Sequence, residues 1–270
     1  MTQKKQYNRV LTIAGSDSGG GAGIQADIKA ISAMGCYAAS ALTAVTVQNT
    51  LGVEAVHPIP LDILRGQIDA VLSDIGADAV KIGMLHSSQV VEVVADALQR
   101  HSISNIVLDP VMVSTSGHRL IEESAIETLK SRLVPLARVI TPNIPEAEIL
   151  SGKKITSNDD LPAIARELSC GGRISVLLKA GHLEADTLVD VLYNAEDNTT
   201  HFFASPRIAS PNTHGTGCTL SSALAAALTK GLSLTEATQQ AKEYLAGALR
   251  AGAEYEIGNG HGPVHHFWKL

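Results

Sequence analysis

The sequence has few aromatic residues, few cysteines and no excess of positive charge. Phe, Trp and Tyr make up 3% of its 270 residues, too few for base-stacking platforms or a large aromatic-rich interface. Lys and Arg number 21 against 27 Asp and Glu, and the net charge of −6 excludes the basic footprint of a nucleic-acid-binding protein. Three widely separated cysteines are an odd number, which indicates a reduced compartment and not a disulfide framework.

Long apolar runs are also absent. The polar start at residues 1–6 leads only into a short apolar run, Val10 to Ala14, which is too short for a secretory signal. No run approaches the length of a membrane span. A hydrophobic content of 45% over this length is enough for a sizeable core. We therefore expect a cytoplasmic protein with one α/β domain over residues 1–270 and with neither membrane nor nucleic-acid partners.

Short apolar segments alternate with segments of helical periodicity along the whole chain. We expect strands at residues 9–14, 38–47, 53–58, 79–83, 106–108, 139–141 and 175–179, followed by a hairpin of 187–193 with 200–204. We expect helices at residues 24–34, 61–73, 89–99, 124–133, 144–150 and 157–169, and two more that begin near 217 and 234. This rhythm predicts a mostly parallel sheet with helices on both faces and Rossmann-like layering, in which 53–58 is an edge strand.

A glycine-rich loop, residues 15–23, follows the first expected strand and precedes a helix. That context is typical of nucleotide-binding loops. The spacing is not G-x-G-x-x-G, because Ile24 stands where the third glycine would be needed, and the chain contains no G-x-x-x-x-G-K-[ST] loop. Residues 17–20 are similar to the nucleophile segment of chymotrypsin-like proteases, but the strand–helix alternation excludes an all-β barrel.

A second glycine-rich turn, residues 212–220, precedes a helix that is rich in Ala and Leu. The unpaired N–H groups and the dipole at such a helix start attract an anion, most often phosphate. Taken alone, Gly215 and Gly217 are better explained by a tight turn. Cys218 lies at the same helix start, where we expect the pKa of its thiol to be lowered. The alternative for Cys218 is a small buried apolar filler.

Polar and glycine residues follow several of the expected strands, and ligands bind at the carboxyl ends of strands in such sheets. We expect the turn at 215–218 to meet the residues at these ends, namely Gly15 to Asp17, Met84, Asp109, Asn143 and Lys179. Asp109 and Glu146 are two carboxylates suited to Mg²⁺ with water and phosphate oxygens, although each is also explained as a helix or turn cap. Lys179 at the end of an apolar strand needs an anionic partner, which a nucleotide phosphate would supply.

These parts together predict phosphoryl transfer to an alcohol, which requires positioning, charge neutralisation and a group that accepts the hydroxyl proton. Cys218 is the candidate base, since a free thiol titrates near pH ~8.5. The C-terminal segment, residues 258–268, contains His265 and His266, but their spacing fits no common metal pattern. We expect that segment to be a packed tail.

Seven segments of the chain occur in the same order in one protein family. They are residues 14–27, 81–85, 108–112, 141–146, 179–182, 212–220 and 262–267. On these segments the chain resembles the hydroxymethylpyrimidine/phosphomethylpyrimidine kinases of thiamine biosynthesis, in the ribokinase-like superfamily. The resemblance covers nearly the whole chain and implies a three-layer α/β/α fold. One departure is Ser18, where the family more often has proline.

The resemblance also implies roles for the residues at the strand ends. Gly215, Thr216 and Gly217 would form an anion hole, and Cys218 stands where sugar kinases of the superfamily carry a catalytic aspartate. Asp109 and Glu146 would organise Mg²⁺, directly or through water. The residues that would face the ATP phosphates are Lys179, Asn143 and Thr213.

For the substrate, the resemblance implies an aminopyrimidine that lies near Gly15 and Asp17, against Met84. Gln48 would hydrogen-bond the amino and nitrogen edge of the ring, because a carboxamide offers both donors and an acceptor. Without the resemblance, Gln48 would be read as an ordinary polar loop residue.

The implied activity is ATP- and Mg²⁺-dependent phosphorylation of 4-amino-5-hydroxymethyl-2-methylpyrimidine to its monophosphate, and of that product to the diphosphate. A homodimer is implied as well. Two alternatives remain at this stage. One is a pyridoxal kinase on the same scaffold, because pyridoxal also carries a hydroxymethyl group on a nitrogen heterocycle. The other is a non-catalytic sensor of a pyrimidine or nucleotide, which the full set of Asp109, Glu146, Lys179 and Cys218 disfavours.

Overall fold

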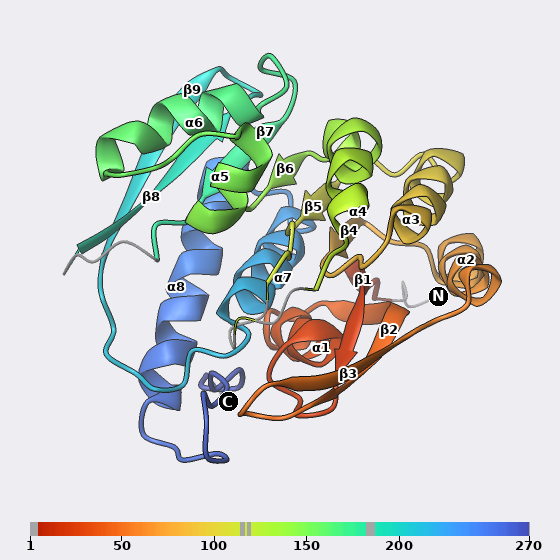
Figure 1. Ribbon diagram of the computed structural model, residues 1–270, viewed down its shortest axis with the longest axis horizontal. Coiled ribbons are helices and arrows are strands. Elements are labelled where there is room, and N and C mark those ends of the chain that lie inside the picture. Colours follow the sequence, from red (N-terminus) through yellow and green to blue (C-terminus); the bar gives the residue numbers. More distant parts are fainter. Residues whose placement is uncertain (1–4, 114–116, 118–119, 182–186, 270) are drawn as a thin grey trace.

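The computed structural model describes residues 5–113, 117, 120–181 and 187–269. Within this part of the chain, nine strands form one sheet in the order β3-β2-β1-β4-β5-β6-β7-β8-β9 (Figure 1). Their bounds are β1 Arg9–Asp17, β2 Tyr37–Gln48, β3 Val53–Pro58, β4 Ala79–Ile82, β5 Ile106–Leu108, β6 Val139–Ile140, β7 Ser175–Leu178, β8 Thr187–Asn194 and β9 Thr199–Pro206. Neighbouring strands in the central part of the sheet, β2-β1-β4-β5-β6-β7, are parallel. At one edge β3 pairs antiparallel with β2, and at the other edge β8 pairs antiparallel with both β7 and β9. The prediction of a mostly parallel sheet with β3 at an edge is confirmed.

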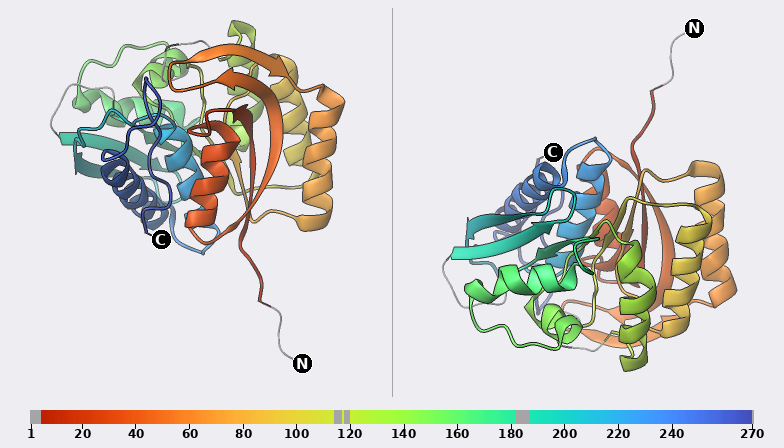
Figure 2. Two further views of the ribbon diagram at one scale, coloured as in Figure 1. Left: turned by 90° about the horizontal axis from the view of Figure 1, so that it is seen from below. Right: turned by 90° about the horizontal axis from the view of Figure 1, so that it is seen from above.

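Helices cover both faces of the sheet, as the two views in Figure 2 show. One layer contains α1 Gly23–Ala33, α7 Thr216–Leu228 and α8 Leu234–Gly252. The other contains α2 Leu61–Ala70, α3 Ser88–Arg100, α4 Glu123–Thr128, α5 Ile144–Ser151 and α6 Leu161–Leu168. Each layer encloses its own cluster of buried apolar side chains against the sheet. The three-layer α/β/α architecture expected from the sequence is therefore confirmed.

The central strands read as continuous apolar runs because both of their faces are covered. All residues of β4, β5 and β7 are buried. Along β1, Leu11 and Ile13 enter one core while Val10 enters the other, as the two-residue period of a strand requires. Burial on both sides is what makes such strands recognisable from the sequence alone.

The first strand is longer than predicted. β1 continues through Gly15 to Asp17, and its register with β2 shifts between Ala14 and Ser16. A Cβ at Gly15 would lie 3.2 Å from Met84 Sδ, so glycine leaves room for that side chain at the irregularity. The strand therefore delivers Asp17 directly to the cavity edge, and the glycine-rich loop begins one residue later.

Two helices end earlier than their apolar periodicity suggested. The helix expected at 61–73 ends at Ala70 and continues as a π-helical turn, Val71–Ile75. The helix expected at 124–133 divides in the same way, with a π-helical turn at Leu129–Leu133. A widened turn keeps the same face apolar, so the residue pattern does not distinguish it from a continuing α-helix.

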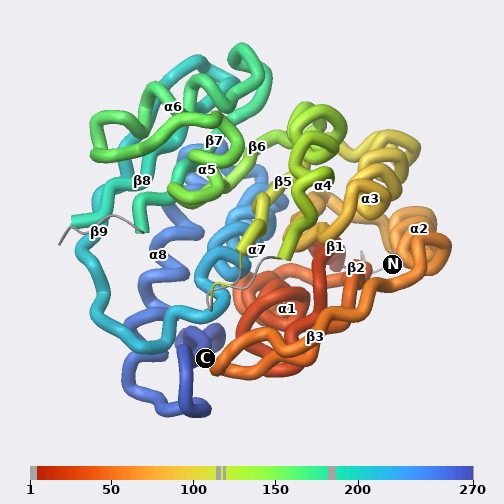
Figure 3. Tube along the Cα trace, in the orientation of Figure 1, coloured from red at the N-terminus to blue at the C-terminus, as the bar shows by residue number. Residues whose placement is uncertain are grey.

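The C-terminal tail is packed, as expected. His265 donates its backbone N–H to Ala248 O at 3.0 Å, and the Tyr244 hydroxyl donates to His266 O at 2.8 Å. The Trp268 indole donates to Tyr244 O at 3.2 Å. Farther up the tail, His261 donates to Thr50 O at 3.0 Å, and Figure 3 shows the dark blue tail beside the orange β2–β3 hairpin. The tail therefore links α8 to the first hairpin of the sheet.

Glycine substitutions in two helices test this packing. A Cβ at Gly247 in α8 would lie 2.0 Å from Trp268 Cζ2, so Gly247→Ala is expected to lower the free energy of unfolding by about 1–3 kcal/mol. Gly66 in α2 has open space around it, so Gly66→Ala is expected to raise that free energy by about 0.5–1 kcal/mol. Urea unfolding of both variants measures the contrast. A Gly247→Ala protein as stable as Gly66→Ala would contradict the close packing of the Trp268 ring against Gly247.

Candidate active site

A cavity of about 1060 Å³ opens at the carboxyl ends of the parallel strands. Every site residue expected from the sequence lines it: Gly15, Asp17, Gln48, Met84, Asp109, Asn143, Glu146, Lys179, Thr213, Gly215, Thr216, Gly217 and Cys218. His182, the last residue of one family segment, lies outside the described residues. The predicted convergence of the strand ends with the second glycine turn is confirmed.

The start of α7 is a bare helix terminus inside this cavity. Gly215 is its N-cap with a φ of 77°, and no side chain caps the helix. A Cβ at Gly215 would lie 1.8 Å from Gly21 O, so both the backbone conformation and the neighbouring loop require glycine. A Cβ at Gly217 would lie 3.4 Å from Asp109 Oδ2 and 3.5 Å from Lys179 Nζ. The turn is tight, and its geometry is also that of an anion site beside a lysine.

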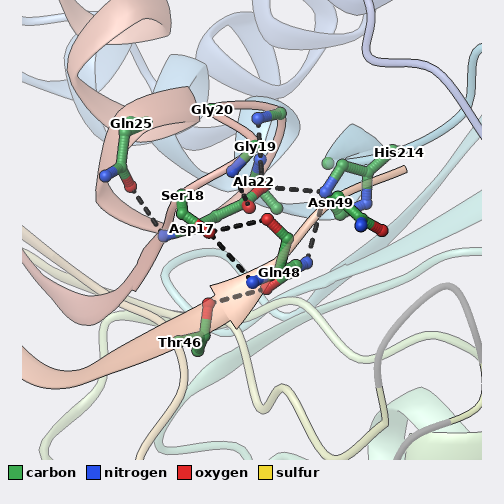
Figure 4. A network of polar contacts seen from close by, with 12 residues as sticks. Asp17, Ser18, Gly19, Gly20, Ala22, Gln25, Thr46, Gln48, Asn49 and His214 are labelled. Carbon is green, nitrogen blue, oxygen red and sulfur yellow. Dashed lines mark hydrogen bonds and ion pairs between the residues drawn. The ribbon is translucent and has the colours of Figure 1, made fainter. Parts of the chain in front are cut away.

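Asp17 holds the first glycine loop against the second (Figure 4). Its Oδ1 accepts from the N–H of Gly19 at 2.8 Å. Its Oδ2 accepts from the N–H of Gly21 and Ala22, at 3.0 and 2.8 Å, and from His214 Nε2 at 2.8 Å. Burial raises the pKa of Asp17, but the hydrogen bond from His214 and those from the backbone outweigh it and hold the pKa below its usual value. The carboxylate therefore shapes the cavity wall through bonds within the chain.

Gln48 ends β2 at the cavity wall beside the same network (Figure 4). Its backbone N–H donates to Ser18 Oγ at 2.9 Å, and the Ser18 hydroxyl donates back to Gln48 O at 2.6 Å. Its side-chain amide lies 3.1 Å from Thr46 Oγ1 and 3.3 Å from His214 Nε2. Ser18 thus anchors the residue expected to read the substrate ring.

Asp109 and Lys179 form a buried ion pair below the α7 turn. Lys179 Nζ donates to Asp109 Oδ1 at 2.9 Å, and Thr141 Oγ1 donates to the same oxygen at 2.8 Å. Burial raises the pKa of Asp109, but the charges of Lys179 and Lys81, together with the hydrogen bonds from Lys179 and Thr141, lower the pKa overall. Burial lowers the pKa of Lys179, but Asp109 and Glu146 outweigh it and raise the pKa overall. The anionic partner that Lys179 requires is therefore Asp109 in the free protein.

Glu146 caps α5 through a capping box with Asn143. Asn143 N–H donates to Glu146 Oε2 at 2.8 Å, and Glu146 N–H donates to Asn143 Oδ1 at 2.9 Å. Burial raises the pKa of Glu146 to about 7, although the positive charge of Lys179 opposes that shift. The capping alternative noted for Glu146 is thus what the structure shows, and the carboxylate still lines the cavity.

The donor set limits how a metal ion would be held. Across the residues that the structure describes, no cluster of three or more His, Cys, Asp or Glu side chains is placed to bind one. Asp109 and Glu146 line the same cavity and supply two carboxylates. A hard cation bound by one or two carboxylates, with water and phosphate oxygens as its other ligands, matches the usual coordination of Mg²⁺. The residues present therefore fit Mg²⁺ that arrives with a nucleotide.

The expected direction of the Cys218 pKa is wrong for the free protein. Burial raises the pKa of the Cys218 thiol to about 11, while the positive charge of Lys81 and a hydrogen bond from Gly23 N–H lower it only in part. Cys218 nevertheless retains some exposure toward the cavity and is not a filler sealed in the core.

Three residues of the site region were not anticipated. His214 joins Asp17 to Gln48, and a fully buried pair of Lys81 with Asp27 lies behind α7. The signal for Lys81 was present, because a lysine inside the apolar run 79–82 needs a buried anion just as Lys179 does. His214 gave no comparable signal, since its role depends on two loops that are distant in sequence.

The fold has three layers, α/β/α, with a cavity at the strand ends that contains a bare helix start and a lysine–carboxylate pair. This combination defines a ribokinase-like phosphotransferase. The phosphomethylpyrimidine kinase family matches residues 17–265. The chain belongs to that family.

Individual relatives agree with this assignment. The hydroxymethylpyrimidine/phosphomethylpyrimidine kinase of Salmonella typhimurium is 47% identical, over 97% of this chain and 98% of its own length. The thiamine biosynthesis bifunctional protein ThiED of Geobacter sulfurreducens is 49% identical over 95% of this chain, which spans 52% of that longer protein. Among solved structures, an ADP complex of Bacillus subtilis pyridoxal kinase has a TM-score of 0.88 and 37% identity, covering 97% of this chain and 98% of that one. No helix in the described residues combines the length and apolarity that a bilayer crossing requires.

The raised pKa of Cys218 leads to a measurable reactivity. In a Cys36→Ala/Cys170→Ala background, the rate of Cys218 alkylation by iodoacetamide is expected to keep rising above pH 9, because the thiolate forms only near a pKa of about 11. Mass spectrometry of the labelled protein as a function of pH measures the midpoint. A midpoint at or below about 8.5, the value for a free thiol, would show that burial does not dominate at this site.

Proposed function

We propose that this protein transfers the terminal phosphoryl group of ATP to the 5-hydroxymethyl group of 4-amino-5-hydroxymethyl-2-methylpyrimidine, and then phosphorylates the monophosphate to the diphosphate. The observation that carries the proposal is the bare start of α7, where Gly217 lies beside the Asp109–Lys179 pair in one cavity. Backbone N–H groups and a lysine placed together neutralise the charge of a transferred phosphoryl group. The names of the Salmonella relative and of the family favour the aminopyrimidine as acceptor.

The nucleotide would bind along the turn and the adjacent strand ends. Lys179, Asn143 and Thr213 line that part of the cavity, and the ADP bound to the Bacillus pyridoxal kinase supports a nucleotide site on this scaffold. Mg²⁺ would be held by Asp109 and Glu146, and when bound it would neutralise phosphate charge. Lys179 would serve both the carboxylates of the metal site and the phosphates of the nucleotide. It already neutralises Asp109, and it lies near the site proposed for the transferred group.

Cys218 Sγ is the proposed acceptor of the hydroxyl proton. Its raised pKa makes the thiolate scarce at neutral pH but a strong base once formed. In a loose phosphoryl-transfer transition state the attacking oxygen is little bonded to phosphorus, so proton removal is needed only late. The rate should therefore rise with pH as the thiolate fraction increases.

Gln48 would recognise the pyrimidine edge, with Met84 and Gly15 beside the ring. The Gln48 amide faces the cavity next to Thr46 and His214, and it offers both donor and acceptor atoms to a ring that carries an amino group beside a nitrogen. Asp17 would contribute by shaping this wall, since its oxygens are engaged by the loop. The proposal extends to a cytoplasmic homodimer, which the family resemblance alone supports.

A coupled ATPase assay with mass detection of the products tests the substrate. With Mg²⁺ and ATP, the aminopyrimidine is expected to yield both mono- and diphosphate, with a kcat/KM above that for pyridoxal. The likeness to the Bacillus pyridoxal kinase makes pyridoxal the matched competitor. A higher kcat/KM for pyridoxal would reassign the enzyme to that substrate, and tight pyrimidine binding without ATP turnover would indicate a sensor.

Replacement of the proposed base tests its role separately. Cys218→Ala is expected to lower kcat by about 10²–10⁴-fold with little change in KM, because only proton acceptance in the transition state is lost. The wild-type rate should rise throughout pH 7 to 9, whereas the residual rate of the variant should level off once Glu146, with a pKa of about 7, is ionised. Cys170→Ala, at a cysteine that does not line the cavity, is the control and should retain wild-type kcat. Full activity in Cys218→Ala would remove Cys218 from the mechanism.

A further inference from the structure

A second carboxylate–lysine pair lies behind the first turns of α7. Lys81 Nζ donates to both oxygens of Asp27, at 2.8 and 2.9 Å, and both side chains have 0% exposure. Thr12 Oγ1 donates to Asp27 Oδ2 at 2.6 Å, and Ser222 Oγ donates to Asp27 Oδ1 at 2.7 Å. The pair therefore joins β1, β4, α1 and α7, and it does not line the cavity.

The contacts between α1 and α7 repeat one helical turn apart. The backbone N–H of Gly23, the first residue of α1, acts on the Cys218 thiol and lowers its pKa. Four residues later on each helix, Asp27 accepts from Ser222. Residues four apart share a face of a helix, so Asp27 lies one turn after Gly23 on α1, and Ser222 lies one turn after Cys218 on α7. The pair is thus attached to the same side of α7 that carries the thiol.

Stability alone gives little reason to retain a buried pair of this kind. Withdrawing two charges from water is costly, and replacing such a pair with apolar side chains is often neutral or stabilising. The pair also restricts its neighbours, because a side chain at Gly83 would place its Cβ 2.9 Å from Lys81 Nζ. A functional reason is available in the charge that Lys81 places behind Cys218.

We propose that Asp27 and Lys81 are positioning residues for the thiol of Cys218. Asp27, held by Lys81, fixes through Ser222 the turn of α7 that carries Cys218, and Lys81 supplies the positive charge that stabilises the thiolate. This proposal rests on the proposed role of Cys218 as base.

The charges that face Cys218 come from four elements of the fold. Lys81 on β4 and Asp27 on α1 form the pair, Asp109 follows β5, and Lys179 follows β7. Of the charges acting on the thiol, Lys81 has the largest effect and favours the thiolate, while Asp27 and Asp109 oppose it by less. The Asp27–Lys81 pair as a whole therefore favours ionisation. Its removal would leave Asp109 and Lys179 in place.

The decisive variant is Lys81→Met/Asp27→Asn in the Cys36→Ala/Cys170→Ala background. It removes both charges, and the Asn side chain keeps an oxygen for one of the hydroxyls of Thr12 and Ser222 while its amide N–H can donate to the other. We expect Cys218 alkylation at pH 9 to slow about tenfold and kcat to fall about tenfold with KM unchanged, because the lost charge acts on the thiolate and not on substrate binding. Arg9→Met/Asp78→Asn is the matched control. It removes an ion pair at the opposite end of β1 and should change neither quantity.

A second variant keeps the proposal testable if the double replacement does not fold. Ser222→Ala leaves both charges in place and removes only the link to α7, so kcat is expected to fall at unchanged KM while the fold persists. A folded double variant with wild-type alkylation and kcat overturns the proposal. A double variant that fails to fold, together with wild-type kcat in Ser222→Ala, overturns it as well.

The alkylation measurement separates this inference from the proposed function. It requires no substrate and reports the thiol alone. Slower alkylation in the double variant would support the charge effect whatever the enzyme phosphorylates. An inactive wild-type protein in the kinase assay would instead count against the proposed function.

Discussion

The close approach of two glycine turns is the constraint on which the rest of the site depends. Gly215 lies against the carbonyl of Gly21 so tightly that a single added carbon would fall 1.8 Å from that oxygen. Asp17 and His214 connect the same two loops by a 2.8 Å hydrogen bond. Because α7 follows directly from this contact, its bare N–H groups take their position from a loop nearly 200 residues earlier in the chain.

Charge in the site is organised around that helix start. Ser221 and Ser222 on α7 point to different carboxylates, Asp109 and Asp27, and each carboxylate is paired with its own lysine. One pair faces the cavity, while the other is sealed inside the fold. In the proposed mechanism, this division separates the charge that would meet a phosphate from the charge that acts on the Cys218 thiol.

The sequence predicted the sheet, its layering and every cavity residue proposed from the strand ends, because buried parallel strands are continuous apolar runs and their ends are marked by glycine or charge. It did not predict the direction of the Cys218 pKa. A helix start is visible in the sequence, whereas the loss of water around a sulfur depends on α1 and β4, which pack against it from elsewhere in the chain. The link through His214 and the π-helical turns were missed for a related reason, since both are decided by three-dimensional packing.

The order of the elements along the chain has a consequence for synthesis. The nine strands of the described residues are complete by Pro206 and the helices α2 to α6 lie before it, so one face of the sheet can be covered while the chain is still emerging from the ribosome. The opposite face has only α1 until α7 and α8 are made, and its apolar surface stays open during that interval. The tail that braces α8 comes last of all. A chain interrupted between Pro206 and α7 would therefore leave a nearly complete sheet with one face covered by α1 alone, and its exposed apolar surface would favour aggregation or recognition by chaperones.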